Sequence, residues 1–234
     1  MATRIFILLS LFTYILSPNV GLANEAEAQL AQTTSNLEEQ IESLMESALL
    51  QNPKSSSVLY QSLASNLDRL HQQIDSMPFD ERRSRELIMA YSWLRVIAID
   101  LRQQAWVGAA IAANQMNGEI IRFINYRNEN LRDIAWMDYL ARDLMLLSKE
   151  DSKENLSIID LRKSQLVLTW QRIRSELIKD FHNKSLAMKG DNLIRQIKQE
   201  KNVDHLIQHA VDTQSLIDTV ENRKKMSEPS PILF

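Results

Sequence analysis

The chain of 234 residues contains no cysteine. This absence excludes disulfide bonds, a lipoprotein anchor, c-type haem attachment, iron–sulfur clusters and thiol chemistry. Small exported domains commonly depend on disulfides, so a chain without them must be stabilised by its hydrophobic core alone. The composition therefore fits a bacterial envelope protein better than a eukaryotic secreted one.

Glycine and proline are almost as scarce, with four glycines and five prolines in the whole chain. No proline lies between Phe79 and Glu228, and only Gly108, Gly118 and Gly190 follow residue 23 among the glycines. Because these two residue types interrupt regular structure, long helices are expected.

Catalytic motifs are missing as well. The sequence has no phosphate-binding glycine loop, no G-x-S-x-G and no H-E-x-x-H, so we predict that the protein is not an enzyme. Its 27 basic and 30 acidic residues give a net charge of −3, which provides no basic face for nucleic acid or anionic lipid.

Residues 1–23 have the organisation of an export signal, with an apolar run over residues 5–16. Pro18 and Gly21 are expected to break the helix before a cut at Asn24. The run is shorter than the roughly 20 residues of a spanning helix, so no stable membrane anchor is expected after cleavage. We predict export to the bacterial periplasm, with secretion as the second choice.

Apolar residues recur in alternating steps of four and three, which marks one buried face of a helix. Four such sets occur: Leu30, Thr34, Leu37, Ile41, Leu44 and Ala48; Leu63, Leu67, Leu70, Ile74 and Met77; Tyr91, Leu94, Ala98, Leu101, Ala105, Gly108 and Ala112; Val203, Leu206, Ala210, Thr213, Ile217 and Val220. No segment alternates with the period of two that a half-buried strand requires. The predicted fold is all-α, an antiparallel bundle of about six long helices with coiled-coil-like packing.

Turn signals place the six helices in one domain over residues 24–226, followed by an extended tail over residues 227–234. The expected turns are at Asn52–Lys54, Met77–Asp80, Asn117–Gly118, Ser148–Lys153 and Gly190. Asp80 is expected to be the N-cap of the third helix. A continuous helix through Gly118, from residue 80 to about residue 149, is the alternative.

Two segments are candidates for contact with a partner protein. The first includes Gly108, Ala109 and Ala112, whose small side chains predict a close helix crossing or, alternatively, a flat surface for a partner. The second is the apolar C-terminus Ile232, Leu233 and Phe234, which follows two prolines. A free carboxylate after an apolar residue can be captured by a peptide-binding groove, although the tail can equally pack on the bundle.

One group of residues has the spacing of a metal site. His205, His209 and Asp212 stand at i, i+4 and i+7 and therefore share one helix face, as transition-metal ligands can. A solvated polar face is the alternative. His71, beside an apolar stripe, is the histidine best placed to ligate a haem, although a hydrogen-bonded histidine is expected more strongly.

Two further groups of residues are expected to be structural. Asp100 and Asp138 interrupt apolar runs, so neighbouring arginines are expected to pair with them. The four tryptophans are expected to fill the core, with an aromatic pocket as the alternative. They are Trp93, Trp106, Trp136 and Trp170.

These features together favour an exported helical interaction or scaffold protein with no cofactor, bound to another envelope protein. A homo-oligomer is also compatible with the sequence. The alternative hypothesis is a helical bundle that carries a metal or another cofactor.

Overall fold

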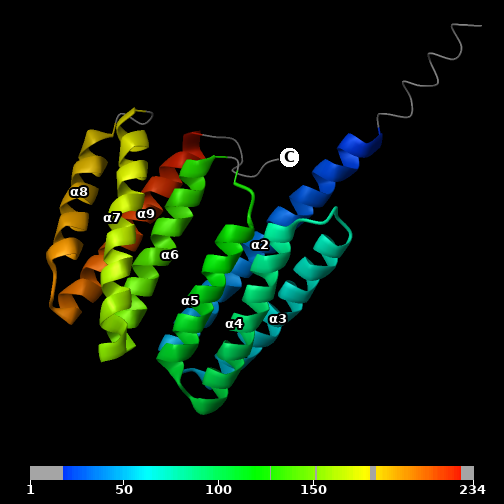
Figure 1. Cartoon of the computed structure of the whole chain (residues 1–234), viewed down its shortest axis with the longest axis horizontal. Helices are drawn as coiled ribbons and strands as arrows, with labels where there is room; N and C mark the ends of the chain where they lie inside the picture. The colour runs from blue at the N-terminus through cyan, green and yellow to red at the C-terminus, as the bar shows by residue number, and fades with distance from the viewer. Residues whose placement is uncertain (1–17, 127, 151, 180–182, 228–234) are drawn as a thin grey trace, which may run out of the picture.

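The computed structural model describes residues 18–126, 128–150, 152–179 and 183–227. In these residues the chain forms eight α-helices and one short 3₁₀ helix, with no strand (Figure 1), so the all-α prediction is confirmed. The elements are α2 (Pro18–Leu49), α3 (Pro53–Asp75), α4 (Glu81–Gln103), α5 (Trp106–Phe123), α6 (Glu129–Glu150), η1 (Lys153–Asn155), α7 (Leu156–Lys179), α8 (Lys184–Gln199) and α9 (Val203–Ser227).

The helices form two groups that lie side by side (Figure 1). Helices α2–α5 surround one apolar cluster, and α6–α9 surround a second. Leu146 of α6 belongs to the first cluster, whereas Ile121 of α5 belongs to the second. Helices α5 and α6 therefore join the two groups.

The predicted apolar stripes explain most of this core. All six members of the first stripe, Leu30 to Ala48, are buried in α2. In α9 the stripe from Leu206 to Val220 is also buried, but its expected first member, Val203, is 38 % exposed. The third stripe fits less well because it continues through Ala105, where the structure has a break between α4 and α5.

That break was not expected, because neither glycine nor proline marks it. Gln104 adopts the left-handed conformation (φ 59°), and its N–H points to the carbonyl oxygens of Asp100 and Leu101. Conversely, the helix end expected at Asn117–Gly118 is wrong, since both residues lie inside α5. The ring of Tyr139 explains the glycine: a Cβ on Gly118 would lie 3.0 Å from its Cε2.

Asparagine side chains begin α8 and α9. The Asn183 side chain accepts a hydrogen bond from the N–H of Leu186 (3.1 Å) and begins α8. Asn202 accepts one from the N–H of His205 (3.0 Å) at the start of α9. Such caps satisfy orphan N–H groups and start helices without proline. Gly190, expected as a helix end, instead lies inside α8.

At the N-terminus α2 begins at Pro18 and continues through Gly21 and the expected cleavage point at Asn24. The expected break there is wrong, since proline is well tolerated at the first helical position. Residues 1–17 of the expected export signal lie outside the described residues. No described helix has the length and apolarity that a membrane crossing demands.

Gly190→Ala should destabilise the protein by more than about 2 kcal/mol, because the new Cβ would overlap an aromatic ring. The ring is that of Trp170, which is only 2 % exposed and would lie 2.1 Å from such a Cβ. Urea unfolding followed by circular dichroism measures the change.

Gly108→Ala is the matched control for this substitution. Its Cβ would approach the flexible carboxylate of Asp100, at 3.1 Å, and would make an ordinary contact with the Cβ of Ala105, at 3.8 Å. It should gain up to about 1 kcal/mol from the higher helix propensity of alanine. Equal effects at the two glycines would contradict the packing explanation.

Candidate functional site

The predicted metal group is only partly assembled. His205 and His209 both approach Glu200, with nitrogen–oxygen distances of 3.5 and 3.6 Å. Asp212 instead accepts a hydrogen bond from Gln208 (2.9 Å). Among the described residues no three histidine, aspartate or glutamate side chains are arranged to hold a metal ion.

His71 lies at the protein surface and contacts side chains of α3 and α4. Its side chain is half exposed and lies 3.7 Å from Asp75. Its Nδ1 is 3.4 Å from the hydroxyl of Tyr91, which donates a hydrogen bond to Asp68 (2.7 Å). These contacts fit the structural interpretation of His71.

The predicted partner surface in α5 lies largely inside the protein. Ala109 is completely buried and Ala112 is 2 % exposed, both in the first apolar cluster, while Gly108 is half-buried. The structure thus supports a close helix crossing here and removes Ala109 and Ala112 from the accessible surface. Ile232, Leu233 and Phe234 lie outside the described residues.

An accessible apolar surface is present instead on α4. Four large apolar side chains on this helix are exposed by 36–65 %. They are Ile88, Met89, Val96 and Ile99. Scattered exposed apolar side chains are normal, but these four lie within about 100° of one another around the helix axis and therefore share one face. We call this stripe, with the exposed polar residues between its members, the α4 outer face.

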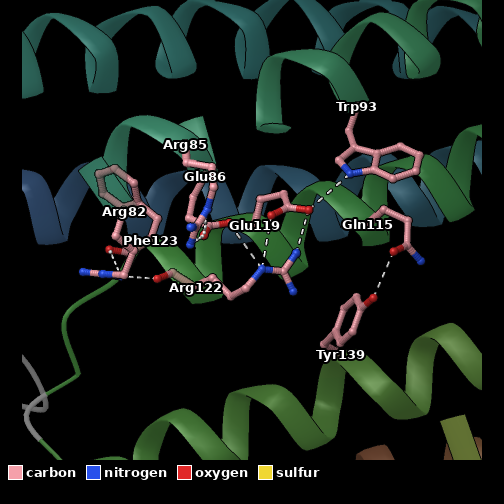
Figure 2. A network of polar contacts seen from close by, with 9 residues as sticks. All are labelled: Arg82, Arg85, Glu86, Trp93, Gln115, Glu119, Arg122, Phe123 and Tyr139. Carbon is pink, nitrogen blue, oxygen red and sulfur yellow. Dashed lines mark hydrogen bonds and ion pairs between the residues drawn. The ribbon is translucent and has the colours of Figure 1, made fainter. Parts of the chain in front are cut away.

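A network of charged side chains on another side of α4 fixes the orientation of this helix. The guanidinium of Arg122, on α5, lies 2.6 Å from Glu119 and 3.4 Å from Glu86, which belongs to α4 (Figure 2). Both carboxyl groups are buried, with residue exposures of 6 % and 4 %. Arg85 adds a second cation, 2.8 Å from Glu86. The network therefore ties the first half of α4 to the end of α5.

The two carboxyl groups have opposite pKa shifts. Burial and the adjacent Glu86 raise the pKa of Glu119, despite the nearby Arg122. Burial also acts to raise the pKa of Glu86, but hydrogen bonds with Arg85 and Glu119 and the charge of Arg122 lower it overall. The pair therefore retains a proton on Glu119 more readily than on Glu86.

Further side chains extend the network along the helices. The indole N–H of Trp93 points to Glu119 (3.4 Å), and Arg82 donates to the carbonyl oxygens of Arg122 and Phe123 at the end of α5 (Figure 2). Arginine donors there satisfy carbonyl groups that have no helical partner. These contacts hold α4, and with it the α4 outer face, in a fixed position against α5.

A second polar network connects α5, α6 and α7. Asp143 is fully buried and accepts bonds from Arg162 (2.5 Å) and Gln115 (2.7 Å). Tyr139 donates to the side-chain oxygen of Gln115 (3.0 Å; Figure 2). Because every one of these groups has a partner, the network is well suited to hold the three helices together.

The two helix groups also meet through charged side chains. Arg142 on α6 lies 2.6 Å from Glu42 of α2 and 2.8 Å from Asp138, which confirms the expected pairing of Asp138. Burial and the neighbouring carboxylates raise the pKa of Glu38 to about 8. Burial also raises the pKa of Asp138 to about 6, although Arg142 acts in the opposite direction. One arginine therefore balances several carboxylates at this seam.

A cleft of about 390 Å³ lies between α7 and α8. Asp191 accepts bonds there from the indole of Trp170 (2.9 Å) and from Arg174 (2.7 Å). Trp170 is buried in the second apolar cluster, as expected for a core tryptophan, and Trp93 and Trp136 pack against the two clusters. The cleft is lined by Val167, Trp170, Gln171, Arg174, Asp191, Ile194, Arg195 and Lys198.

Comparison of the chain with protein-family models, with curated proteins and with solved structures found no match. The surfaces and networks of this chain alone therefore indicate what it can do.

Arg122→Ala should lower the free energy of unfolding by about 3 kcal/mol, because it leaves two buried carboxyl groups without their shared cation. The exposed pair of Arg132 and Glu129, 3.7 Å apart, provides the control. Arg132→Ala should cost less than about 1 kcal/mol. Urea denaturation at pH 7 separates the two variants, and equal losses would contradict the bridging role of Arg122.

The buried carboxyl groups where the two helix groups meet predict a stability that depends on pH. The pKa values of Glu38 (about 8) and Asp138 (about 6) lie above their ordinary values of 4.5 and 3.8. The folded chain thus binds these protons more tightly than the unfolded chain, and the stabilisation is lost as pH rises from about 4 to about 8, between the ordinary and the raised pKa values. Each proton contributes at most about 1.4 kcal/mol per pH unit.

Glu38→Gln should flatten this part of the stability curve, because the neutral amide does not titrate. Urea denaturation of both proteins at several pH values between 4.5 and 9 measures the difference. Parallel curves for the two proteins would show that Glu38 titrates normally in the folded state.

Proposed function

We propose that the mature chain is an exported helical interaction protein that binds a protein helix on the α4 outer face. The observation that supports this is the alignment of exposed Ile88, Met89, Val96 and Ile99 on one helix. Exposed apolar surface is costly in water, and its arrangement as a stripe is the usual feature of helix docking.

The chemistry of the face defines what can bind there. Arg85, Arg95 and Arg102 are exposed beside the apolar side chains. Their aliphatic stems can cover apolar atoms of a partner while the guanidinium groups remain in water. The matching ligand is an amphipathic helix with its own apolar stripe and a carboxylate near one end.

The ion pairs between α4 and α5 are consistent with this function. Glu86, Glu119 and Arg122 form ion pairs that hold α4 against α5, so the outer face is formed before a partner arrives. A preformed surface loses little conformational entropy on binding, which leaves more of the contact energy for affinity. Export through residues 1–23 and docking through Ile232–Phe234 remain parts of this proposal, because the apolar run and the apolar C-terminus favour them.

Ile88→Glu should reduce the amount of specifically captured protein at least about tenfold in an in-cell crosslinking pull-down. A buried, unpaired carboxylate at the centre of an interface costs several kcal/mol, which is more than a factor of ten in affinity. The tag follows Asn24, so that Phe234 remains free, and untagged copies of the chain are counted among the captured proteins.

Val58→Glu is the matched control, because Val58 is 60 % exposed on a different helix, α3. Capture should be unchanged by this variant. Undiminished capture by folded Ile88→Glu protein would show that the α4 outer face is not the interface. Deletion of Ile232–Phe234 in the same assay measures the separate contribution of the tail.

A further inference from the structure

The α4 outer face has a two-fold pattern in its own sequence. Its centre line follows steps of four and three: Glu81, Arg85, Ile88, Ser92, Val96, Ile99 and Gln103. At 100° per residue these side chains lie within about 40° of Ser92, opposite the buried Ala90 and Leu94. Ser92 is therefore the midpoint of a stripe that extends three turns in either direction.

Reversing the helix about Ser92 gives a complementary surface. In an antiparallel pair of α4 helices centred there, Ile88 meets Val96 of the second copy, and Arg85 meets Ile99 of the second copy. Ile88 is 65 % exposed, Val96 36 % and Ile99 43 %, so each contact covers apolar surface that is open in the single chain. The small Ser92 lies at the crossing point, where two helices approach most closely.

The charges at the ends of the face agree with this pairing. Glu81 is exposed in the first turn of α4, and Arg102 is exposed in its last turn. The antiparallel arrangement brings Glu81 next to Arg102 of the second copy at both ends. A parallel arrangement would instead place Arg85 against Arg85 and Arg102 against Arg102, which is repulsive. Antiparallel neighbours also have favourably opposed helix dipoles.

We infer that a second copy of this chain is the protein that occupies the α4 outer face, with the two α4 helices antiparallel and Ser92 facing Ser92. This inference rests on the proposed function, because it names the partner of the same surface. The contact is isologous, so it closes after two copies and leaves no unsatisfied face to continue a filament. One helix from each copy makes a small interface, which predicts a dimer that dissociates on dilution.

A single cysteine tests the geometry directly, because the chain has none of its own. Two helix axes 8–10 Å apart bring inward-facing Cα atoms to about 3.5–5.5 Å, which overlaps the range that a disulfide requires. Ser92→Cys should therefore form a disulfide-linked dimer under mild oxidation.

Ser215→Cys is the matched control. Both serines are exposed on helices and donate to a carbonyl four residues earlier, Ser92 to Ile88 (3.0 Å) and Ser215 to Val211 (3.3 Å). At micromolar protein the Ser92→Cys dimer should form roughly 100-fold faster, since pairing raises the effective thiol concentration into the millimolar range. Adding Ile88→Glu should reduce the Ser92→Cys rate to that of the control.

Equal crosslinking rates for the two single-cysteine variants would overturn this inference, as would a fast rate that persists with Ile88→Glu. Neither result contradicts the proposed function, because the pull-down detects any captured protein. Equal crosslinking rates for the two cysteine variants, together with loss of capture by Ile88→Glu in the pull-down, would show that a different protein binds the α4 outer face. A folded Ile88→Glu variant that still captures its partner would reject the proposed function itself.

Discussion

The arrangement of the first helix group depends on one arrangement of charge, in which the half-exposed guanidinium of Arg122 lies between the buried carboxyl groups of Glu119 and Glu86. Two carboxyl groups with little access to water require a nearby cation, which Arg122 supplies, while burial and the adjacent Glu86 raise the pKa of Glu119. Because Glu86 belongs to α4 and the other two residues belong to α5, the contact fixes the rotation of α4 about its axis. That rotation decides which side chains of α4 face water.

The same constraint produces the exposed stripe. With Glu86 directed towards α5, side chains on other sides of the helix point into the solvent. At 100° per residue Ile88 and Ile99 lie about 160° and 140° from Glu86, and Val96 lies about 80° from it. Turning α4 to bury them would remove the carboxylate from Arg122, at a cost that a few apolar contacts do not repay. A partner can cover the stripe without disturbing the network, which is why we place the interface there.

Charge is handled differently where the two helix groups meet. Arg142 serves both Glu42 and Asp138, while Glu38 lies close by with a raised pKa. Excess negative charge at a seam weakens the contact as pH rises, whereas the balanced network around Arg122 has no comparable excess.

Local patterns in the sequence predict much of this architecture. The stripe in α2, the Asp80 N-cap, whose side chain accepts from the N–H of Arg83, and the pairing of Asp138 with Arg142 all follow from neighbours within a few residues. Those signals come from residues close together in the chain, so a single sequence is enough to recognise them.

The predictions that failed involve contacts between distant segments. Gly118 and Gly190 resemble helix ends in the sequence, but each makes room for an aromatic ring from another helix, Tyr139 and Trp170 respectively. Glu86 and Arg122 are 36 residues apart, so no periodicity connects them. The α4 outer face does not stand out in the sequence because the apolar residues of α4 fit two stripes, and only packing reveals which one is buried.

Sedimentation velocity of the chain from Asn24 onward, from low to high micromolar concentration, tests the central claim most directly. We expect a monomer that converts reversibly to a dimer as concentration rises, with no larger species, because an antiparallel α4 pair closes on itself. A sedimentation coefficient that stays at the monomer value throughout, or one that continues to grow beyond the dimer, would contradict a self-pairing α4 outer face.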